Sequence, residues 1–248
     1  MAIDHVIDDD GILEIVMDNP PVNALGISDT QEIATILNSV QKDQSIKVAI
    51  LTARGKGFCA GVDIKEIENL QENDGILKIN RSCYEAFASV YECAVPVIAA
   101  VNDFCLGSGI GLAGAADMVI SADGVNFGLP EVDNGALGAL THLTRLVPQQ
   151  RARQMLYTCE TATAEELLGY GSVYKVVPLE QLESTARKLA KEIADKPPRT
   201  IRAAKESANG IELVDIRNSY RFEQGFTYEL NLAGEGEKAR QAFIEGRR

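Results

Sequence analysis

Basic residues are scarce in this sequence. Its 248 residues include 24 lysines and arginines against 36 aspartates and glutamates, which gives a formal net charge of −12. No cluster of lysines and arginines offsets this charge along the chain. A nucleic-acid-binding surface needs a concentration of positive charge to pair with phosphates. The composition therefore argues against nucleic acid as the main partner and leaves small anionic ligands open.

The sequence also lacks any apolar run that approaches the roughly 18–20 residues of a membrane-spanning helix. It begins MAIDHVIDDDG, with three consecutive acids and neither a basic nor an apolar leader segment. A secretory signal would place an apolar stretch behind a positively charged start. We therefore expect no membrane association and no signal peptide.

Cysteine and histidine residues are present, but they lack the sequence spacings typical of zinc sites and disulfide frameworks. The five cysteines, at positions 59, 83, 93, 105 and 159, are odd in number and contain no C-x-x-C pair. The two histidines, His5 and His142, offer no metal-binding pair. This pattern predicts reduced thiols, no disulfide or zinc framework, no metal, and a cytoplasmic location.

Short apolar runs alternate with helical patterns through most of the chain, which is typical of an α/β fold. The runs with the length and composition of strands are residues 11–17, 47–53, 95–101, 117–123 and 172–178. Ser28–Gln31 and Thr163–Glu166 have the capping-box spacing that opens a helix. The pattern is helical from Leu179 onward, with a break at Lys196-Pro197-Pro198. We predict an α/β core over residues 1–195 and a C-terminal helical region over residues 196–248.

A glycine-rich stretch, LGSGIGLAGAAD (residues 106–117), follows the third of these strands. Gly109, Gly111 and Gly114 satisfy G-x-G-x-x-G, the dinucleotide fingerprint, and favour an NAD(P)-dependent oxidoreductase as one alternative. Residues 102–106 depart from that fingerprint, because its first glycine should stand directly at the strand end. Another interpretation pairs this loop with residues 57–65, so that two loops aim backbone N–H groups at one developing oxyanion.

Two segments carry a family resemblance: KVAILTARGKGFCAGVDIKEI (residues 47–67) and VPVIAAVNDFCLGSGIGLAGAADMVISADGVNFGLPE (residues 95–131). From about Gly11 to its C-terminus the chain resembles the crotonase (enoyl-CoA hydratase/isomerase) superfamily. The resemblance implies a spiral of ββα units with a C-terminal helical region that serves oligomerisation and CoA contact, assembled as homotrimers or hexamers. It also implies an acyl-CoA substrate whose thioester oxygen accepts hydrogen bonds from the N–H groups of Val62 and Ser108. Such fixed dipoles stabilise the negative charge of an enolate.

Hydratases of this superfamily use two glutamates, and this sequence retains one of them. The resemblance places the retained acid at Glu131 and puts a glycine, Gly111, at the position of the other. Adding water across a double bond suits two positioned carboxylates, so a single one argues against an ordinary hydratase. His142 and Asp133 are candidate substitutes for the lost acid. Gly111 is also expected to leave space for a bulkier acyl group, such as a ring.

A narrower resemblance, to the ring-opening crotonases of actinobacterial steroid catabolism, extends over residues 90–102, 110–114, 127–148, 200–206 and 219–234. It implies hydrolysis of a C–C bond in a cyclic keto-acyl-CoA. Water would add to a ring ketone, the bond would break, and the departing carbanion would be held as a thioester enolate. Glu131 would activate the water or return a proton to carbon. A hydratase or double-bond isomerase that uses one glutamate, and a non-catalytic scaffold, stay open as alternatives.

The family pattern also implies where the CoA binds, and it implies no cofactor beyond the CoA of the substrate. The loops expected to contact the coenzyme contain Ala24, Leu25, Ala60, Asp63 and Ile64. The cations expected to meet its phosphates are Arg54, Lys56 and Lys65.

Two positions near the C-terminus complete the expected CoA site. Phe243 stands where the family places an adenine-contacting phenylalanine, and Arg247 is one position beyond the basic residue often found there, which here is Gly246. The acyl group is expected to lie against the helix around residues 80–92, whose candidate lining residues are Cys83, Phe87 and Tyr91.

Overall fold

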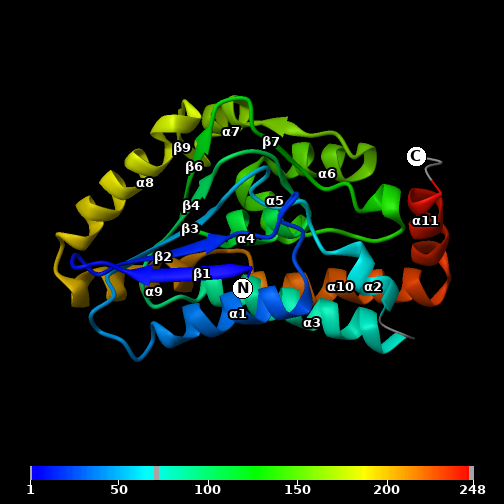
Figure 1. Cartoon of the computed structure of the whole chain (residues 1–248), viewed down its shortest axis with the longest axis horizontal. Coiled ribbons are helices and arrows are strands. Elements are labelled where there is room, and N and C mark those ends of the chain that lie inside the picture. Colours follow the sequence, from blue (N-terminus) through cyan, green and yellow to red (C-terminus); the bar gives the residue numbers. More distant parts are fainter. Residues whose placement is uncertain (1, 70–72, 246–248) are drawn as a thin grey trace.

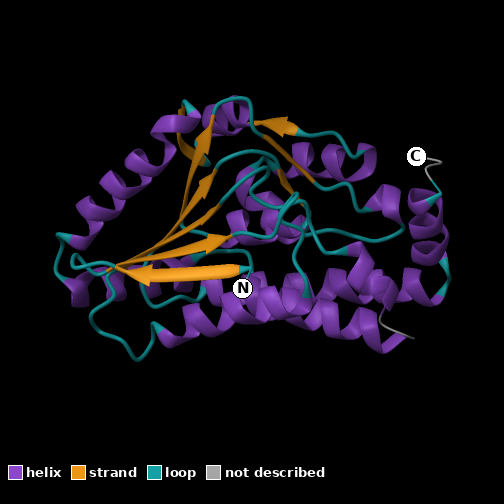
Figure 2. Ribbon diagram, viewed as in Figure 1, coloured by secondary structure: helices purple, strands orange, loops and turns teal. Residues whose placement is uncertain are grey.

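A six-stranded sheet runs through the computed structural model, which describes residues 2–69 and 73–245 (Figures 1 and 2). Its order is β1-β2-β3-β4-β6-β9; β1 and β2 are antiparallel and every other pair is parallel. The strands are Ile3–Ile7, Ile12–Met17, Val48–Ala53, Val97–Val101, Met118–Ala122 and Val173–Val177. The strands expected from the apolar runs are confirmed, and β1 was not anticipated. β4 is buried at every position, as expected for a parallel strand that is covered on both faces.

A second, three-stranded sheet lies next to the glycine-rich stretch. It consists of β5 (Cys105–Leu106), β7 (Asn126–Gly128) and β8 (Ala162–Thr163), in the order β5-β7-β8. β5 leads directly into helix α4 (Ser108–Ala115), and Glu131 follows the end of β7. The short sheet therefore brings the glycine-rich stretch and the predicted acid to one place.

Helices cover both faces of the large sheet (Figure 1). On one face, α8 (Leu179–Ala194) packs Leu182, Ala186 and Ala190 against Ile50 and Ile98 of the sheet. The larger core lies on the other face, under α1 (Ile27–Ser39), α3 (Asn73–Tyr91) and α4. The shorter elements are α2 (Ile64–Asn69), the 3₁₀ turn η1 (Val132–Asn134), α5 (Leu140–Leu146), α6 (Gln149–Thr158) and α7 (Ala164–Tyr170).

The C-terminal helices are α9 (Pro198–Ile211), α10 (Ile216–Leu232) and α11 (Glu235–Ile244). α9 begins at Pro198, which confirms the predicted break. α10 lies beside α3, where the Gln224 side chain donates to the carbonyl oxygen of Asn80 at 2.6 Å. Tyr220 of α10 is buried in the larger core. The C-terminal helices therefore pack on the α/β core of the same chain.

The two expected helix caps have different outcomes. Thr163 accepts a hydrogen bond from the N–H of Glu166 at 3.2 Å, and Gly171 ends α7 with a φ of 81°. The expectation that Ser28 caps α1 is wrong, because the helix already begins at Ile27. There the Asp29 carboxylate accepts from the N–H of Gly26 at 2.9 Å. An acid inside the first turn therefore caps the helix in place of the serine.

All five cysteines are free thiols, and four of them are buried. Burial raises the pKa of Cys59 to about 12 and that of Cys83 to about 11, so both stay protonated. None of the helices in residues 2–69 and 73–245 has the length and apolar character needed to cross a membrane. Across the same ranges, no group of three or more His, Cys, Asp or Glu side chains is arranged to hold a metal ion.

Candidate active site

The two loops singled out in the sequence run side by side in the structure. Cys59 forms a parallel bridge with Cys105, and the N–H of Leu106 donates to the carbonyl oxygen of Cys59 at 2.8 Å. The N–H of Phe58 donates to the carbonyl oxygen of Phe104 at 3.0 Å. Val62 lies three residues after Cys59, and Ser108 lies three residues after Cys105. The two residues therefore occupy equivalent positions in the two adjacent loops.

The backbone of Val62 is oriented by Leu25. Leu25 donates its N–H to the carbonyl oxygen of Gly61 at 2.9 Å and accepts from the N–H of Asp63 at 3.0 Å. In this parallel bridge the neighbours of Val62 make the hydrogen bonds. The N–H of Val62 itself therefore points away from Leu25. Among the described residues it has no acceptor.

Ser108 is the first residue of α4, so its N–H has no acceptor within the helix. The approach of the two loops depends on Gly61 and Gly107. A Cβ atom on Gly61 would lie 4.0 Å from the nitrogen of Ser108, and a Cβ on Gly107 would lie 3.1 Å from the Cα of Gly61. Gly107 also has a φ of 56°, in the left-handed region that favours glycine. The N–H of Ser108, which has no acceptor in the described part of the chain, is thus held beside the segment that carries Val62.

The carboxyl group of Glu131 lies at the same place. A Cβ on Gly107 would lie 2.5 Å from Oε1 of Glu131, and a Cβ on Gly138 would lie 2.6 Å from Oε2. Oε2 is buried and has no hydrogen-bond partner among the described residues. Burial raises the pKa of Glu131 to about 7, so the group can both accept and donate a proton near neutral pH.

These groups line one cavity of about 160 Å³. The loops contribute Ala60, Val62, Ile64 and Ser108, and Glu131 lies among them. Helix α3 supplies Ile76, Ile79, Asn80, Cys83 and Phe87, and α10 supplies Tyr220 and Thr227. Tyr91 instead donates its hydroxyl to the carbonyl oxygen of Asn209 at 3.2 Å and does not line this cavity. The cavity is therefore mostly apolar, with a backbone-amide side and one carboxyl group.

The Phe87 ring fills the space beside Gly111, the position at which hydratases of the family are expected to have their second glutamate. A Cβ on Gly111 would lie 2.2 Å from two ring atoms of Phe87. The expectation that Gly111 opens space for a larger acyl group is therefore wrong at this position. The Phe87 ring occupies the place that a side chain at residue 111 would need, and it forms an apolar wall there.

His142 and Asp133 are not brought to the cavity. His142 is fully buried behind Phe87, with their ring centroids 5.1 Å apart, and neither ring nitrogen has a partner among the described residues. Burial lowers the pKa of His142 to about 3, so the ring stays neutral. Asp133 is exposed in η1. We therefore assign neither residue to proton transfer.

The glycines of the G-x-G-x-x-G match are buried within α4. A Cβ on Gly109 would lie 3.0 Å from Cβ of Cys59, and a Cβ on Gly114 would lie 2.4 Å from the carbonyl oxygen of His142. These glycines, like Gly111, let α4 pack closely against its neighbours. They lie within a buried helix rather than in an open loop at a strand end, so the match does not mark a dinucleotide site.

The expected CoA residues are distributed unevenly. Ala60 and Ile64 line the cavity. Leu25 forms a bridge with Val62, and Ala24 directly precedes Leu25 in the chain. Asp63 accepts from the N–H of Lys65 at 2.9 Å, and the Lys56 and Lys65 side chains are exposed. The side chain of Phe243 and all of Arg247 lie outside the described residues.

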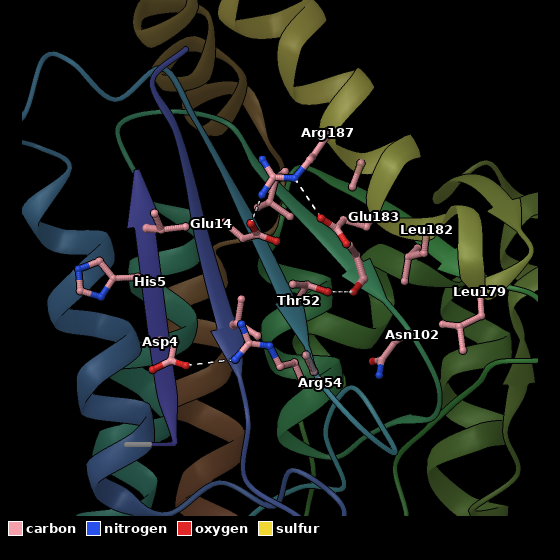
Figure 3. Close-up of a pocket in the computed structure, with 16 residues that line it drawn as sticks. Asp4, His5, Glu14, Thr52, Arg54, Asn102, Leu179, Leu182, Glu183 and Arg187 are labelled. Atoms are coloured by element: carbon pink, nitrogen blue, oxygen red, sulfur yellow. Dashed lines mark hydrogen bonds and ion pairs between the residues drawn. The ribbon is translucent and has the colours of Figure 1, made fainter. Parts of the chain in front are cut away.

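Arg54 lies in a different cavity, of about 380 Å³, between the sheet and α8 (Figure 3). Its guanidinium contacts Asp4 at 3.2 Å and Asp18 at 3.6 Å. Arg187, in the same cavity, pairs with Glu14 and with Asp8. Both guanidinium groups are thus matched by carboxylates on the α8 side of the sheet. We do not include Arg54 in the candidate site.

The sequence places Asn80 in the helix expected beside the acyl group without naming it as a lining residue, and it does not indicate Tyr220 or Thr227 at the site. Tyr220 and Thr227 are two helical turns apart, so the spacing would place them on one face of α10. Nothing in the spacing indicates that this face closes the cavity. That information comes only from the packing of α10 on α3.

Known proteins match this chain over nearly its whole length. A model of the enoyl-CoA hydratase/isomerase family matches residues 8–248. A protein of Rhodococcus jostii RHA1, called (7aS)-7a-methyl-1,5-dioxo-2,3,5,6,7,7a-hexahydro-1H-indene-carboxyl-CoA hydrolase, is 51% identical over 99% of this chain and 95% of its own. The protein of the same name in Mycobacterium tuberculosis is 46% identical over 99% of both chains.

The fold also matches solved structures. An enoyl-CoA hydratase/isomerase from Mycobacterium paratuberculosis superposes with a TM-score of 0.89 over 97% of each chain, at 20% identity. At that identity the likeness concerns the fold alone, and the family match and the two relatives carry the rest. This chain belongs to the enoyl-CoA hydratase/isomerase (crotonase) family.

Proposed function

We propose that this protein binds a cyclic keto-acyl-CoA thioester and opens its ring by hydrolysis of a C–C bond, in the degradation of steroid rings. The observation that carries the proposal is the pairing of one carboxyl group, Glu131, with two amides that have no acceptor in residues 2–69 and 73–245, while Phe87 fills the place of a second acid. The names of the two relatives, both hydrolases of a bicyclic dioxo-acyl-CoA, support it.

The amides of Val62 and Ser108 hold the thioester oxygen in this proposal. That oxygen gains negative charge when an electron pair is delocalised from the acyl ring into the thioester. Two N–H dipoles fixed by the backbone stabilise this charge without reorganising, and each contributes about 3–4 kcal/mol in comparable oxyanion holes. The convergence of the Gly61 and Gly107 segments supports this role.

Glu131 moves the protons. As the carboxylate, it takes a proton from water while the water oxygen bonds to the ring ketone carbon. The adjacent C–C bond then breaks, the ketone carbon becomes a carboxylic acid, and the bonding pair moves into the thioester as an enolate. Glu131 returns its proton to carbon, so the products equal the substrate plus one water. A carboxyl group with a pKa of about 7 is suited to both transfers.

The CoA is proposed to lie along the loops of Ala24, Leu25, Ala60, Asp63 and Ile64, with Lys56 and Lys65 near its phosphates. Phe243 and Arg247 belong to this proposal on the family pattern alone. The reaction consists of proton transfers and hydrogen bonds, so the proposal includes no cofactor besides the CoA of the substrate.

A homotrimer or hexamer is part of the proposal, and it is supported by apolar side chains exposed on and around the C-terminal helices. These are Ile211, Leu213, Phe222, Phe226 and Leu232. Exposed apolar side chains of this kind are the ones that an interface between chains would cover. A molar mass of three or six chains by light scattering would support the assembly, and the mass of one chain would contradict it. A cytoplasmic location is proposed from the free thiols.

A screen of acyl-CoA thioesters by mass spectrometry tests the reaction. Linear enoyl-CoA, cyclic enoyl-CoA and the bicyclic dioxo-hexahydroindene-carboxyl-CoA are each incubated with the protein. The expected result is a gain of one water on the bicyclic compound, with a free carboxyl group in the product. Hydration or isomerisation of enoyl-CoA without ring opening would favour the second candidate, a hydratase or isomerase with one glutamate. No turnover of any thioester would favour a non-catalytic scaffold.

A further inference from the structure

The proposed reaction creates two negatively charged oxygens, and the loops account for one of them. The amides of Val62 and Ser108 hold the thioester oxygen. The ring ketone oxygen also becomes negative when water adds to its carbon, and in an apolar cavity this charge needs a donor of its own. Since the inference concerns that second oxygen, it rests on the proposed function.

Most polar side chains of the cavity already use their hydrogens within the protein. Thr227 accepts from the N–H of Leu137 at 3.1 Å and donates to its carbonyl oxygen at 3.2 Å. Asn134 donates to the carbonyl oxygen of Pro130 at 3.0 Å, and the amide of Asn80 faces the carbonyl oxygen of Gln224 at 3.5 Å. These contacts make the three side chains part of the cavity's frame.

Tyr220 is different. Its side chain lines the cavity and is 8% exposed. The nearby Gln224 side chain donates instead to the carbonyl oxygen of Asn80 at 2.6 Å, and within the described residues the Tyr220 hydroxyl has no protein acceptor for its hydrogen. A ligand oxygen in the cavity would supply that acceptor.

The position of the hydroxyl is fixed by ring packing. The Tyr220 ring lies 5.3 Å from the Phe87 ring and 5.0 Å from the His142 ring, centroid to centroid. Both neighbours are buried, so the phenol has little freedom to turn away. Burial also raises the pKa of Tyr220 well above its usual value, which keeps the group protonated and able to donate.

We propose that Tyr220 is a further catalytic residue, whose hydroxyl donates a hydrogen bond to the ring ketone oxygen of the acyl group. No proton is transferred: the O–H bond of Tyr220 stays intact while the oxygen that it contacts becomes negative. The residue distinguishes keto-acyl thioesters from thioesters whose ring has no ketone, because only the former give the hydroxyl an acceptor.

The test is Tyr220→Phe, which keeps the ring contacts and removes the hydroxyl. On the bicyclic dioxo-hexahydroindene-carboxyl-CoA, kcat is expected to fall at least about tenfold, the effect of losing one hydrogen bond to a charged oxygen. KM should change less than about threefold, since the bond strengthens mainly in the transition state. Tyr157→Phe, at a tyrosine that is 67% exposed and outside the cavity, is the matched control and should leave kcat unchanged.

A binding measurement separates this role from a structural one. Cyclohexene-carboxyl-CoA has a ring without a ketone, so both Tyr220→Phe and the wild type should bind it with the same Kd. Weaker binding of this compound by the variant, or a wild-type kcat on the dioxo compound, would overturn the role of Tyr220. Failure of the wild type to open the dioxo compound would instead overturn the proposed function, and this inference with it.

Discussion

Glu131 lies directly against the backbone of Gly107: a Cβ on that glycine would be 2.5 Å from the carboxylate Oε1. Gly107 also precedes Ser108, the first residue of α4, whose N–H is one of the two proposed donors. The carboxyl group and one of the two proposed donors are therefore adjacent through a single glycine. The group proposed to transfer protons and one of the groups proposed to stabilise charge are thus positioned by the same turn of the chain.

Gly107→Ala should inactivate the protein. The added methyl group would displace the carboxyl group of Glu131 and strain a backbone with a φ of 56°. We expect kcat to fall at least about 100-fold, the lower end of the effect of losing general acid–base catalysis. Steady-state kinetics on the ring substrate provide the measurement.

Gly169→Ala is the matched control for that substitution. Gly169 lies inside α7, and a Cβ there would contact nothing within 4 Å. Helix propensity predicts an unfolding free energy about 0.5–1 kcal/mol higher and unchanged turnover. Equal turnover in Gly107→Ala and Gly169→Ala would show that the contact with Glu131 does not matter.

Activity should rise with pH through the pKa of Glu131. Burial raises this pKa to about 7, and the carboxylate form is the one that accepts a proton from water. Below about pH 7 the group is protonated, so kcat/KM should increase with pH and level off above pH 8. A profile of kcat/KM that is flat from about pH 5.5 to 8.5 would exclude Glu131 as the titrating base.

Restoring the lost acid alone should fail. In Gly111→Glu the Cβ of the new side chain would lie 2.2 Å from ring atoms of Phe87. We expect a loss of more than about 3 kcal/mol of unfolding free energy, from overpacking together with a buried charge. Neither this variant nor the wild type should hydrate crotonyl-CoA at the rate of an ordinary hydratase. Loss of enone absorbance at such a rate would show that the Phe87 wall is no barrier to hydration.

The sequence predicted the strands and both site loops because local patterns determine them. β-branched apolar runs mark β3 (Val48–Ala53), β4 (Val97–Val101) and β9 (Val173–Val177), and the glycines mark the two backbones that must approach each other. Successive side chains of a strand point to opposite faces of the sheet, so Ile50, Thr52 and Arg54 share one face. This alternation in and after β3 predicts that Arg54 lies away from the larger core, as the structure shows.

The walls of the cavity were not predictable in the same way. The sequence showed that an acid was absent at Gly111, but only the packing of α3 shows that Phe87 fills the space. Tyr220 reaches the cavity from α10, which lies roughly 100 residues beyond α4 in the chain. Contacts between such distant segments depend on the tertiary packing of whole helices rather than on any local motif.

The central claim is that Glu131 transfers the protons beside the two backbone amides. The most direct test is the turnover of Glu131→Gln and wild type on the bicyclic dioxo-hexahydroindene-carboxyl-CoA, followed as ring-opened acid per enzyme. Our account predicts a fall of at least about 100-fold, with a nearly unchanged Kd for the thioester, because the amide keeps the size of the side chain and loses its acid–base function. Turnover of Glu131→Gln within a few fold of wild type would contradict the account.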